Sequence, residues 1–366
     1  MARSHPGSLD LNNNSFLQFF VASIVFLLKW VCRPFAYRNA NILVISFNNI
    51  GDSILSLPAL RQLKKENPGV KITLLTYSDL GFLFKDASLV DNVVFVDRNE
   101  FRAGGKIPGH SVFRKARECG SGVVINFSEN PQSVLTMVLS GGYRFYGIAR
   151  KAYSTAFDSF KTMRDMPHLQ DIYFDAVDSY KIVDRDSAER VLPQRKSMGD
   201  EIIITPFAGW DEKMWGLAKI TDLAVRLAKS HPVNFVIEKG KLDRDVIRGI
   251  ASERITVTEL SSIKEYLPHL ERACMLVAND TGPVHLAAWY GLPTVAIFGP
   301  TNPDFCKQPG EHHLAVVKKI HCSPTRYNYC ELDAGRSCPV RECLNRITVD
   351  EVEVAVRAHL GRVLPQ

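Results

Sequence analysis

The sequence lacks the motifs of several common enzyme classes. It contains no G-x-x-x-x-G-K-S/T loop, no H-E-x-x-H, no G-x-S-x-G and no G-x-G-x-x-G. These spacings support nucleotide hydrolysis on a phosphate loop, zinc proteolysis, serine hydrolysis and dinucleotide redox chemistry, respectively. Their absence removes support for all four classes.

The sequence also lacks a strong charge excess and a long apolar run. Its net charge of +6 over 366 residues is compatible with an anionic substrate or an acidic membrane surface. That charge is too small to predict binding to nucleic acid. The apolar run over residues 16–28 contains Gln18 and Ser23 and is shorter than the about 20 residues that span a bilayer. No small-residue cleavage site follows it, so a secretory signal is a poor fit.

The leader, residues 1–40, contains a candidate membrane-interface helix. Residues 16–33 are apolar and rich in aromatic side chains, and Lys29, Arg33 and Arg38 lie at or after the end of the run. This pattern is typical of a helix that lies in the plane of a membrane surface. The alternative is a helix that packs on the protein's own surface.

No C-x-x-C pair occurs, although four of the eight cysteines are clustered between residues 322 and 343. Their separations of eight, eight and five do not match a zinc ribbon. Three interpretations stay open: a tetrahedral structural Zn or Fe site, reduced structural cysteines, or disulfides. The candidate metal ligands are Cys322, Cys330, Cys338 and Cys343.

The pattern of apolar segments predicts an α/β protein with two domains. Short buried-type strands alternate with helical segments in both halves of the chain, which is typical of parallel sheets. The polar segment 184–200 separates the halves. We therefore predict four parts: the leader 1–40, a domain over 41–190, a second domain over 191–345 that includes the cysteine-rich segment 322–343, and a closing helix over 346–366. The predicted strands are 42–47, 70–76, 93–96, 123–127, 201–205, 233–237, 274–278 and 294–298, and the main predicted helices are 53–65, 132–139, 215–229, 243–252 and 349–360.

The turn over residues 279–286 is the most informative segment. A strand ends there, a Thr-Gly turn follows, and Pro283 stands at the first position of a helix. The N-terminus of a helix is a ready anion site, and His285 could add a hydrogen bond or a positive charge. The alternative is an ordinary strand-to-helix junction in which Asp280 caps the helix and His285 lies on the surface.

Three segments together resemble the heptosyltransferase family, glycosyltransferase family 9. Residues 279–303 match D-S/T-G-x-x-H-x-A-A-x-x-G-x-P followed by a strand and F-G-P-T-x-P. Residues 50–60 resemble I-G-D-x-V/I-L-x-x-P-A-L, and residues 206–215 resemble P-G-A-x-x-x-x-K-x-W. The resemblance covers residues 41–360 approximately.

The resemblance implies a GT-B fold, with two Rossmann-like domains whose parallel sheets face a central cleft. It also implies transfer, with inversion, of a heptose from ADP-heptose to a lipopolysaccharide core or related lipid-linked saccharide acceptor. The first domain would bind the acceptor and the second the donor. No metal is expected to be required for catalysis, and no nucleic acid partner is expected. The location implied is the cytoplasmic face of a bacterial inner membrane, with peripheral membrane contact.

The family pattern also assigns roles to single residues. The general base falls on Asp52, whose alternative is to cap a helix that starts at Ser53. Diphosphate contacts fall on Lys213, for which the alternative is an ordinary surface lysine, and on the 281–282 turn. The full set of predicted substrate-binding residues is Asn49, Gly51, Lys213, Asp280, Thr281, Gly282, Pro283 and His285.

Some questions stay open at this level. The acidic residue that contacts the donor ribose is either Glu238 or Asp243, and residues 206–209 depart from the family's P-G-A pattern. Another nucleotide-sugar donor or a protein acceptor would fit the same residues. A non-catalytic nucleotide-sugar-binding protein of this fold is a further alternative.

Overall fold

The computed structural model of the chain describes residues 15–86, 88–102, 107–162, 168–190, 199–324, 329–330 and 338–363, with side chains of the first helix described from residue 22. Contacts divide the described residues into two units. The first takes them from Met1–Asn48, Ser56–Arg164 and Gln170–Ala188, and the second from Asn49–Leu55, Asp165–Leu169 and Glu189–Gln366. The division at Ala188/Glu189 falls inside the predicted linker over 184–200.

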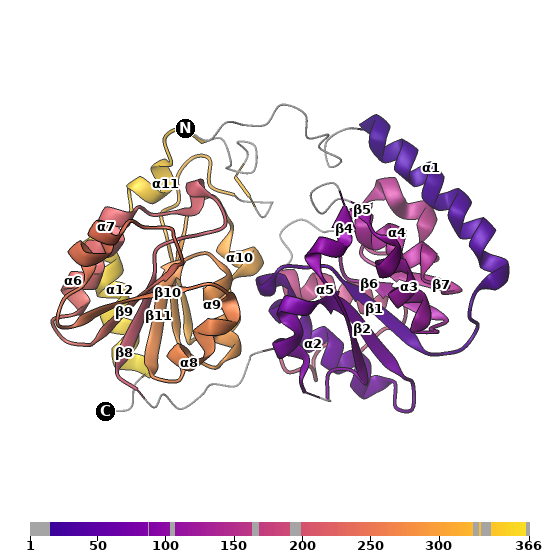
Figure 1. Cartoon of the computed structure of the whole chain (residues 1–366), viewed down its shortest axis with the longest axis horizontal. Helices are drawn as coiled ribbons and strands as arrows, with labels where there is room; N and C mark the ends of the chain where they lie inside the picture. Colours follow the sequence, from indigo (N-terminus) through magenta and orange to yellow (C-terminus); the bar gives the residue numbers. More distant parts are fainter. Residues whose placement is uncertain are drawn as a thin grey trace. The chain divides into compact units, whose positions relative to one another are not determined.

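The first unit is built on a parallel sheet in the order β3-β2-β1-β6-β7 (Figure 1). The central strand β1 is buried along its whole length, as expected for a parallel sheet covered on both faces. The strands are β1 (Ile42–Ser46), β2 (Ile72–Tyr77), β3 (Asn92–Val96), β6 (Val123–Asn126) and β7 (Arg144–Gly147), with a short antiparallel pair β4 (Phe101–Arg102) and β5 (Ile107–Pro108). The helices that lie wholly or mainly in this unit are α1 (Ser15–Cys32), α2 (Ile50–Glu66), α3 (His110–Glu118), α4 (Pro131–Leu139) and α5 (Leu169–Asp178); the start of α2, up to Leu55, and the first residue of α5 belong to the second unit.

The second unit contains a larger parallel sheet in the order β10-β9-β8-β11-β12-β13 (Figure 1). Numbered within the unit, this order is 3-2-1-4-5-6, that of a Rossmann-type fold. The strands are β8 (Glu201–Thr205), β9 (Val233–Glu238), β10 (Ile255–Leu260), β11 (Ala273–Asn279), β12 (Thr294–Phe298) and β13 (His313–Val317). The helices are α6 (Leu217–Leu227), α7 (Arg244–Ile250), α8 (Leu267–Leu270), α9 (Gly282–Trp289), α10 (Pro303–Cys306), α11 (Glu342–Asn345) and α12 (Val349–Val363).

The predicted α/β class with two parallel sheets is confirmed, and all eight predicted strands are present. The prediction missed the outer strands β7, β10 and β13, together with α3 and α5. In β10, the run Ile-Thr-Val-Thr-Glu-Leu is buried only at its two ends, so its apolar signal is weak. The start of α2 was placed three residues late, at Ser53 instead of Ile50.

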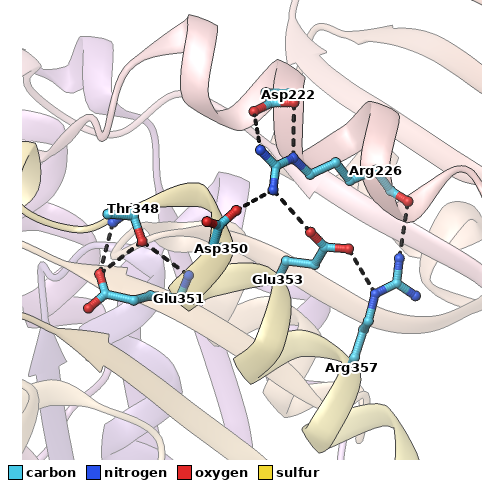
Figure 2. Close-up of polar contacts among 7 residues, drawn as sticks. All are labelled: Asp222, Arg226, Thr348, Asp350, Glu351, Glu353 and Arg357. Carbon is cyan, nitrogen blue, oxygen red and sulfur yellow. Dashed lines mark hydrogen bonds and ion pairs between the residues drawn. The ribbon is translucent and has the colours of Figure 1, made fainter.

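The closing helix α12 is fixed to α6 by polar contacts and by packing (Figure 2). Thr348 and Glu351 form reciprocal backbone contacts at its start, since the Glu351 carboxylate accepts from Thr348 N at 2.9 Å and Thr348 Oγ1 accepts from Glu351 N at 3.2 Å. This capping box satisfies helix N–H groups that lack intrahelical partners. Arg226 of α6 bridges to Asp350 and to Glu353, the latter at 3.3 Å. The predicted C-terminal helix is therefore confirmed.

Helix α1 lies along the outside of the first unit, against α4 and the 3-10 turn η4 (Lys151–Ala156) (Figure 1). Val25 is buried in this contact, and Lys29 forms an ion pair with Asp158 at 3.0 Å. One face of the predicted helix over 16–33 therefore packs on the protein. Across the described residues, no helix combines the length and hydropathy required to span a membrane.

Candidate functional site

Two loops emerge together at the point where the strand order of the second sheet reverses. β8 and β11 are parallel neighbours, with Thr205 opposite Ala278 near their carboxyl ends. The chain beyond β8 continues to β9 on one side, and the chain beyond β11 continues to β12 on the other. Ligands of open parallel sheets bind at such a switch point. Residues 206–215 and 279–285, which carry two of the sequence motifs, are therefore brought together here.

Asn279, the last residue of β11, holds the two loops together. Its side chain is fully buried; Nδ2 donates to Pro206 O at 2.6 Å, and Oδ1 accepts from Trp215 N at 3.0 Å. Buried backbone groups need such partners, because an unpaired polar group out of water is costly. No role was predicted for Asn279 from the sequence. Its position directly before Asp280 in the 279–303 motif was the signal that could have identified it.

Lys213 and Asp280 form a buried ion pair beyond the ends of these strands. Lys213 Nζ contacts Asp280 Oδ2, and the two side chains are only 12% and 6% exposed. Thr301 Oγ1 donates to the same Oδ2 atom at 2.7 Å. Burial acts to raise the pKa of Asp280, but the Lys213 ammonium and the hydrogen bonds outweigh it and lower that pKa. Asp280 is therefore ionised, and the surface-lysine alternative for Lys213 is wrong.

The first turn of α2 belongs to the same unit and packs on the start of α9. A Cβ atom on Gly51 would lie 2.8 Å from Cδ2 of His285, and one on Gly282 would lie 2.8 Å from Cγ2 of Ile50. Both distances are too short for a real side chain. The two predicted glycines are therefore needed for close packing of the helix starts, while their contact with substrate stays a prediction.

Asp52 is the third residue of α2 and is partly buried. The pKa of Asp52 is raised to about 6. Burial is the largest cause; Lys213 opposes it, Asp280 adds to it, and a hydrogen bond with the Asn49 backbone acts to lower the pKa. The alternative that Asp52 caps a helix starting at Ser53 is wrong, because Asn49 precedes the helix and its carbonyl accepts from Ser53 N at 2.9 Å. Asn49 itself is exposed.

His285 is buried within α9, so the alternative that placed it on the surface is wrong. The Nδ1 atom of His285 lies 2.8 Å from Gln308 Nε2, and the Nε2 atom of His285 lies 3.9 Å from Asp280 Oδ1. Burial lowers the pKa of His285 to about 4, although Asp280 opposes that shift. The ring is neutral near pH 7, which corrects the expectation of a positive charge. The alternative in which Asp280 caps this helix is also wrong, because Thr281 is the N-cap of α9.

A cavity of about 320 Å³ adjoins the start of α9. Thr281 and Pro283 line it, together with Glu238 at the end of β9 and Tyr266. Tyr266 donates or accepts a hydrogen bond at 3.1 Å with Thr205 Oγ1, and burial raises the pKa of Tyr266 to about 12. Asp243 does not line this cavity and stands instead at the N-cap of α7. Of the two candidate ribose-binding acids, Glu238 is thus the one placed at the cavity.

A sequence model described as "Glycosyltransferase family 9 (heptosyltransferase)" matches residues 158–334, which include both loops of this site. The matched segment of this chain is thus similar to glycosyltransferase family 9. A curated relative, lipooligosaccharide heptosyltransferase 2 of Campylobacter jejuni, is 27% identical over 128 residues, which are 33% of this chain and 40% of the relative. The chain thus matches less than half the length of that relative.

Solved structures of family 9 proteins share the fold. A glycosyltransferase family 9 protein from Veillonella parvula matches with a TM-score of 0.68 at 19% identity, covering 89% of this chain and 98% of that one. The E. coli heptosyltransferase WaaC with ADP matches with a TM-score of 0.62 at 15% identity, covering 88% and 99%. The predicted GT-B fold class is confirmed by this likeness.

The four clustered cysteines line one small cavity of about 70 Å³, beside His321. Among the described residues no disulfide joins these cysteines. Burial, together with smaller contributions from the other three thiols, raises the pKa of Cys343 to about 11. Within the described ranges, there is no group of at least three His, Cys, Asp or Glu side chains that could hold a metal ion. The Zn or Fe site stays a prediction, and no chemical step depends on it.

We expect Gly51→Ala to displace the His285 ring and to lower the free energy of unfolding by about 1–3 kcal/mol. Urea denaturation followed by circular dichroism measures this change. Gly361→Ala in α12 is the matched control, because a Cβ there meets nothing within 4 Å; it should be neutral or stabilising by up to about 1 kcal/mol. Equal stability of Gly51→Ala and wild type would contradict the close packing.

The raised pKa of Asp52 predicts a pH-dependent stability. The folded state binds this proton more tightly than the unfolded chain, where an aspartate has a pKa of about 3.9. The stabilisation from protonated Asp52 is therefore complete below about pH 4 and is lost as the pH rises through about 6. Denaturation at several pH values should show this loss in wild type relative to Asp52→Asn. Parallel pH profiles of the two proteins would refute the shift.

Proposed function

We propose that this protein is an inverting glycosyltransferase that uses a nucleotide-diphosphate sugar donor. The observation that carries the proposal is the arrangement of Asp52, with its raised pKa, beside the Lys213–Asp280 pair and the start of α9. Two carboxylates lie close together, and their environments drive their pKa values in opposite directions. Such a separation is a frequent mark of distinct acid–base roles.

The donor diphosphate fits between the start of α9 and Lys213. The first N–H groups of a helix have no intrahelical partners and carry partial positive charge. Thr281 and Gly282 provide this end of α9, and Lys213 adds a full positive charge. Asp280 and Thr301 hold Lys213 in place, while the neutral His285 offers hydrogen bonding without charge. The adjoining cavity with Glu238 and Tyr266 suits the nucleoside, since a carboxylate can accept hydrogen bonds from ribose hydroxyls.

Asp52 serves as the general base in this proposal. The acceptor hydroxyl oxygen attacks the anomeric carbon, and its proton passes to the Asp52 carboxylate as the new C–O bond forms. The bond to the donor diphosphate breaks on the opposite side, and the electron pair leaves with the diphosphate. Lys213 and the α9 N-terminus stabilise the charge that develops there. A pKa of about 6 leaves Asp52 mostly ionised at neutral pH and still a better base than an ordinary aspartate.

We further propose ADP-heptose as the donor and a lipopolysaccharide core, or related lipid-linked saccharide, as the acceptor. The match of residues 158–334 to the family model supports this, as do the names of the relatives, a lipooligosaccharide heptosyltransferase and a heptosyltransferase solved with ADP. The corresponding place of action is the cytoplasmic face of a bacterial inner membrane. Calorimetric titration with ADP-heptose, ADP, UDP-glucose and GDP-mannose tests the donor. Preference for UDP or GDP sugars would replace ADP-heptose, and binding of none would overturn the transferase proposal.

Asp52→Asn should abolish transfer without abolishing donor binding. We expect kcat/KM to fall by about 10²–10⁴-fold, because the general base is lost, while the Kd for ADP changes less than about twofold. In wild type, kcat/KM should rise with pH through about 6, as the carboxylate forms. Steady-state kinetics and calorimetry measure both quantities. An equal loss of binding and turnover would assign Asp52 a structural role instead.

Lys213→Met should weaken ADP binding by about 10–100-fold through loss of a charged contact. It should also lower the melting temperature, because the buried Asp280 carboxylate loses its partner. The double variant Lys213→Met/Asp280→Asn is the matched control, since it removes the unpaired charge. It should regain stability without regaining ADP affinity. Recovery of both in the double variant would show that Lys213 acts on stability alone.

A further inference from the structure

The exposed side of α1 is apolar. We call Ile24, Phe26, Leu27, Trp30 and Val31 its outer face. Leu27, Trp30 and Val31 are 63%, 57% and 58% exposed, although large apolar side chains in a soluble helix normally face the core. At 100° per residue the five positions share one continuous side of the helix. A contiguous patch of this kind marks an interaction surface more often than isolated exposed side chains do.

The opposite side of α1 has the reverse polarity. Val25 is buried in the core of the first unit, and Ala22 and Leu28 pack against that core. Lys29, the helix's charged residue among those with described side chains, is also on this side, buried and paired with Asp158. The helix therefore directs its charge inward and its apolar side chains outward, which would be unfavourable if water were the surroundings of the outer face.

Three arginines lie near the C-terminal end of the outer face. The Arg33 guanidinium is 5.7 Å from the Trp30 ring and 4.9 Å from the Tyr143 ring, and Arg38 is 4.9 Å from Tyr143. Arg117 donates to Phe35 O at 3.4 Å. Within the described part of the chain, none of the three forms an ion pair with a carboxylate. Their positive charge is available to an anionic partner.

We propose that the outer face of α1 and Arg33, Arg38 and Arg117 form a docking surface for an anionic phospholipid bilayer. The apolar side chains enter the boundary between headgroups and acyl chains, with the helix parallel to the membrane plane. Trp30 and Tyr143 have the amphipathic rings that favour this boundary, and the arginines contact lipid phosphates. A second copy of the chain would cover the apolar side chains equally well, but would bring the same uncompensated arginines against one another. Charge complementarity therefore favours the lipid surface.

The test is sedimentation of the full chain with vesicles, which needs no transfer assay and so stands or falls separately from the proposed function. Wild type should bind vesicles of phosphatidylethanolamine with phosphatidylglycerol and bind pure phosphatidylcholine vesicles at least about tenfold less. Leu27→Glu/Val31→Glu should reduce binding to the anionic vesicles by at least about tenfold. Arg33→Gln/Arg38→Gln should reduce it as well, and should weaken its dependence on salt.

Val354→Glu is the matched control, since Val354 is an exposed apolar residue of α12 in the second unit. It should bind vesicles as wild type does. If the double glutamate variant does not fold by circular dichroism, Leu27→Ser/Val31→Ser replaces it. The proposal is overturned if wild type ignores anionic vesicles, if the α1 variants bind as well as Val354→Glu, or if light scattering shows a dimer that the α1 variants dissociate.

Discussion

The ion pair between Lys213 and Asp280 lies beyond the ends of β8 and β11, almost out of contact with solvent. A buried carboxylate without its partner is strongly destabilising, so each of these residues fixes the position of the other. Asn279 fixes the loop that carries Lys213, and Thr301 supplies a further hydrogen bond to Asp280. The arrangement of the site therefore depends on one satisfied buried charge at the switch point of a Rossmann-type sheet.

This charge also sets the properties of its neighbours. The Asp280 carboxylate, kept ionised by Lys213, raises the pKa of nearby Asp52 in addition to the larger effect of burial. Burial lowers the pKa of His285, whereas it raises that of Asp52. The imidazolium form is disfavoured, and the ring is left neutral. One environment thus yields an ionised carboxylate, a basic carboxylate and a neutral imidazole. Such a separation would suit the proposed role of Asp52 as a general base next to a donor diphosphate.

Helix α1 and the site show the same balance between burial and charge in different surroundings. In the site, charged groups are buried because each has a partner, as Asp280 has Lys213 and Thr301. In α1, Lys29 is buried for the same reason, with Asp158 as its partner, while Leu27 and Trp30 stay exposed. Exposed apolar surface on a helix costs free energy in water, and contact with a bilayer would remove that cost.

From the sequence alone we could predict the α/β class, eight strands of the two sheets and the segments that carry the candidate site residues. Continuous apolar runs such as residues 42–46 need no tertiary context, because strands buried on both faces are apolar throughout. The resemblance to the family's motifs likewise pointed to Asp52, Lys213 and Asp280. Tertiary structure alone decided which of these side chains meet, since Lys213 and Asp280 are joined only when β8 and β11 pair. It also decided that Asn279 links the loops and that His285 is buried and neutral. It placed Glu238, and not Asp243, at the cavity. Burial and long-range pairing depend on neighbours in space, which a linear sequence pattern does not contain.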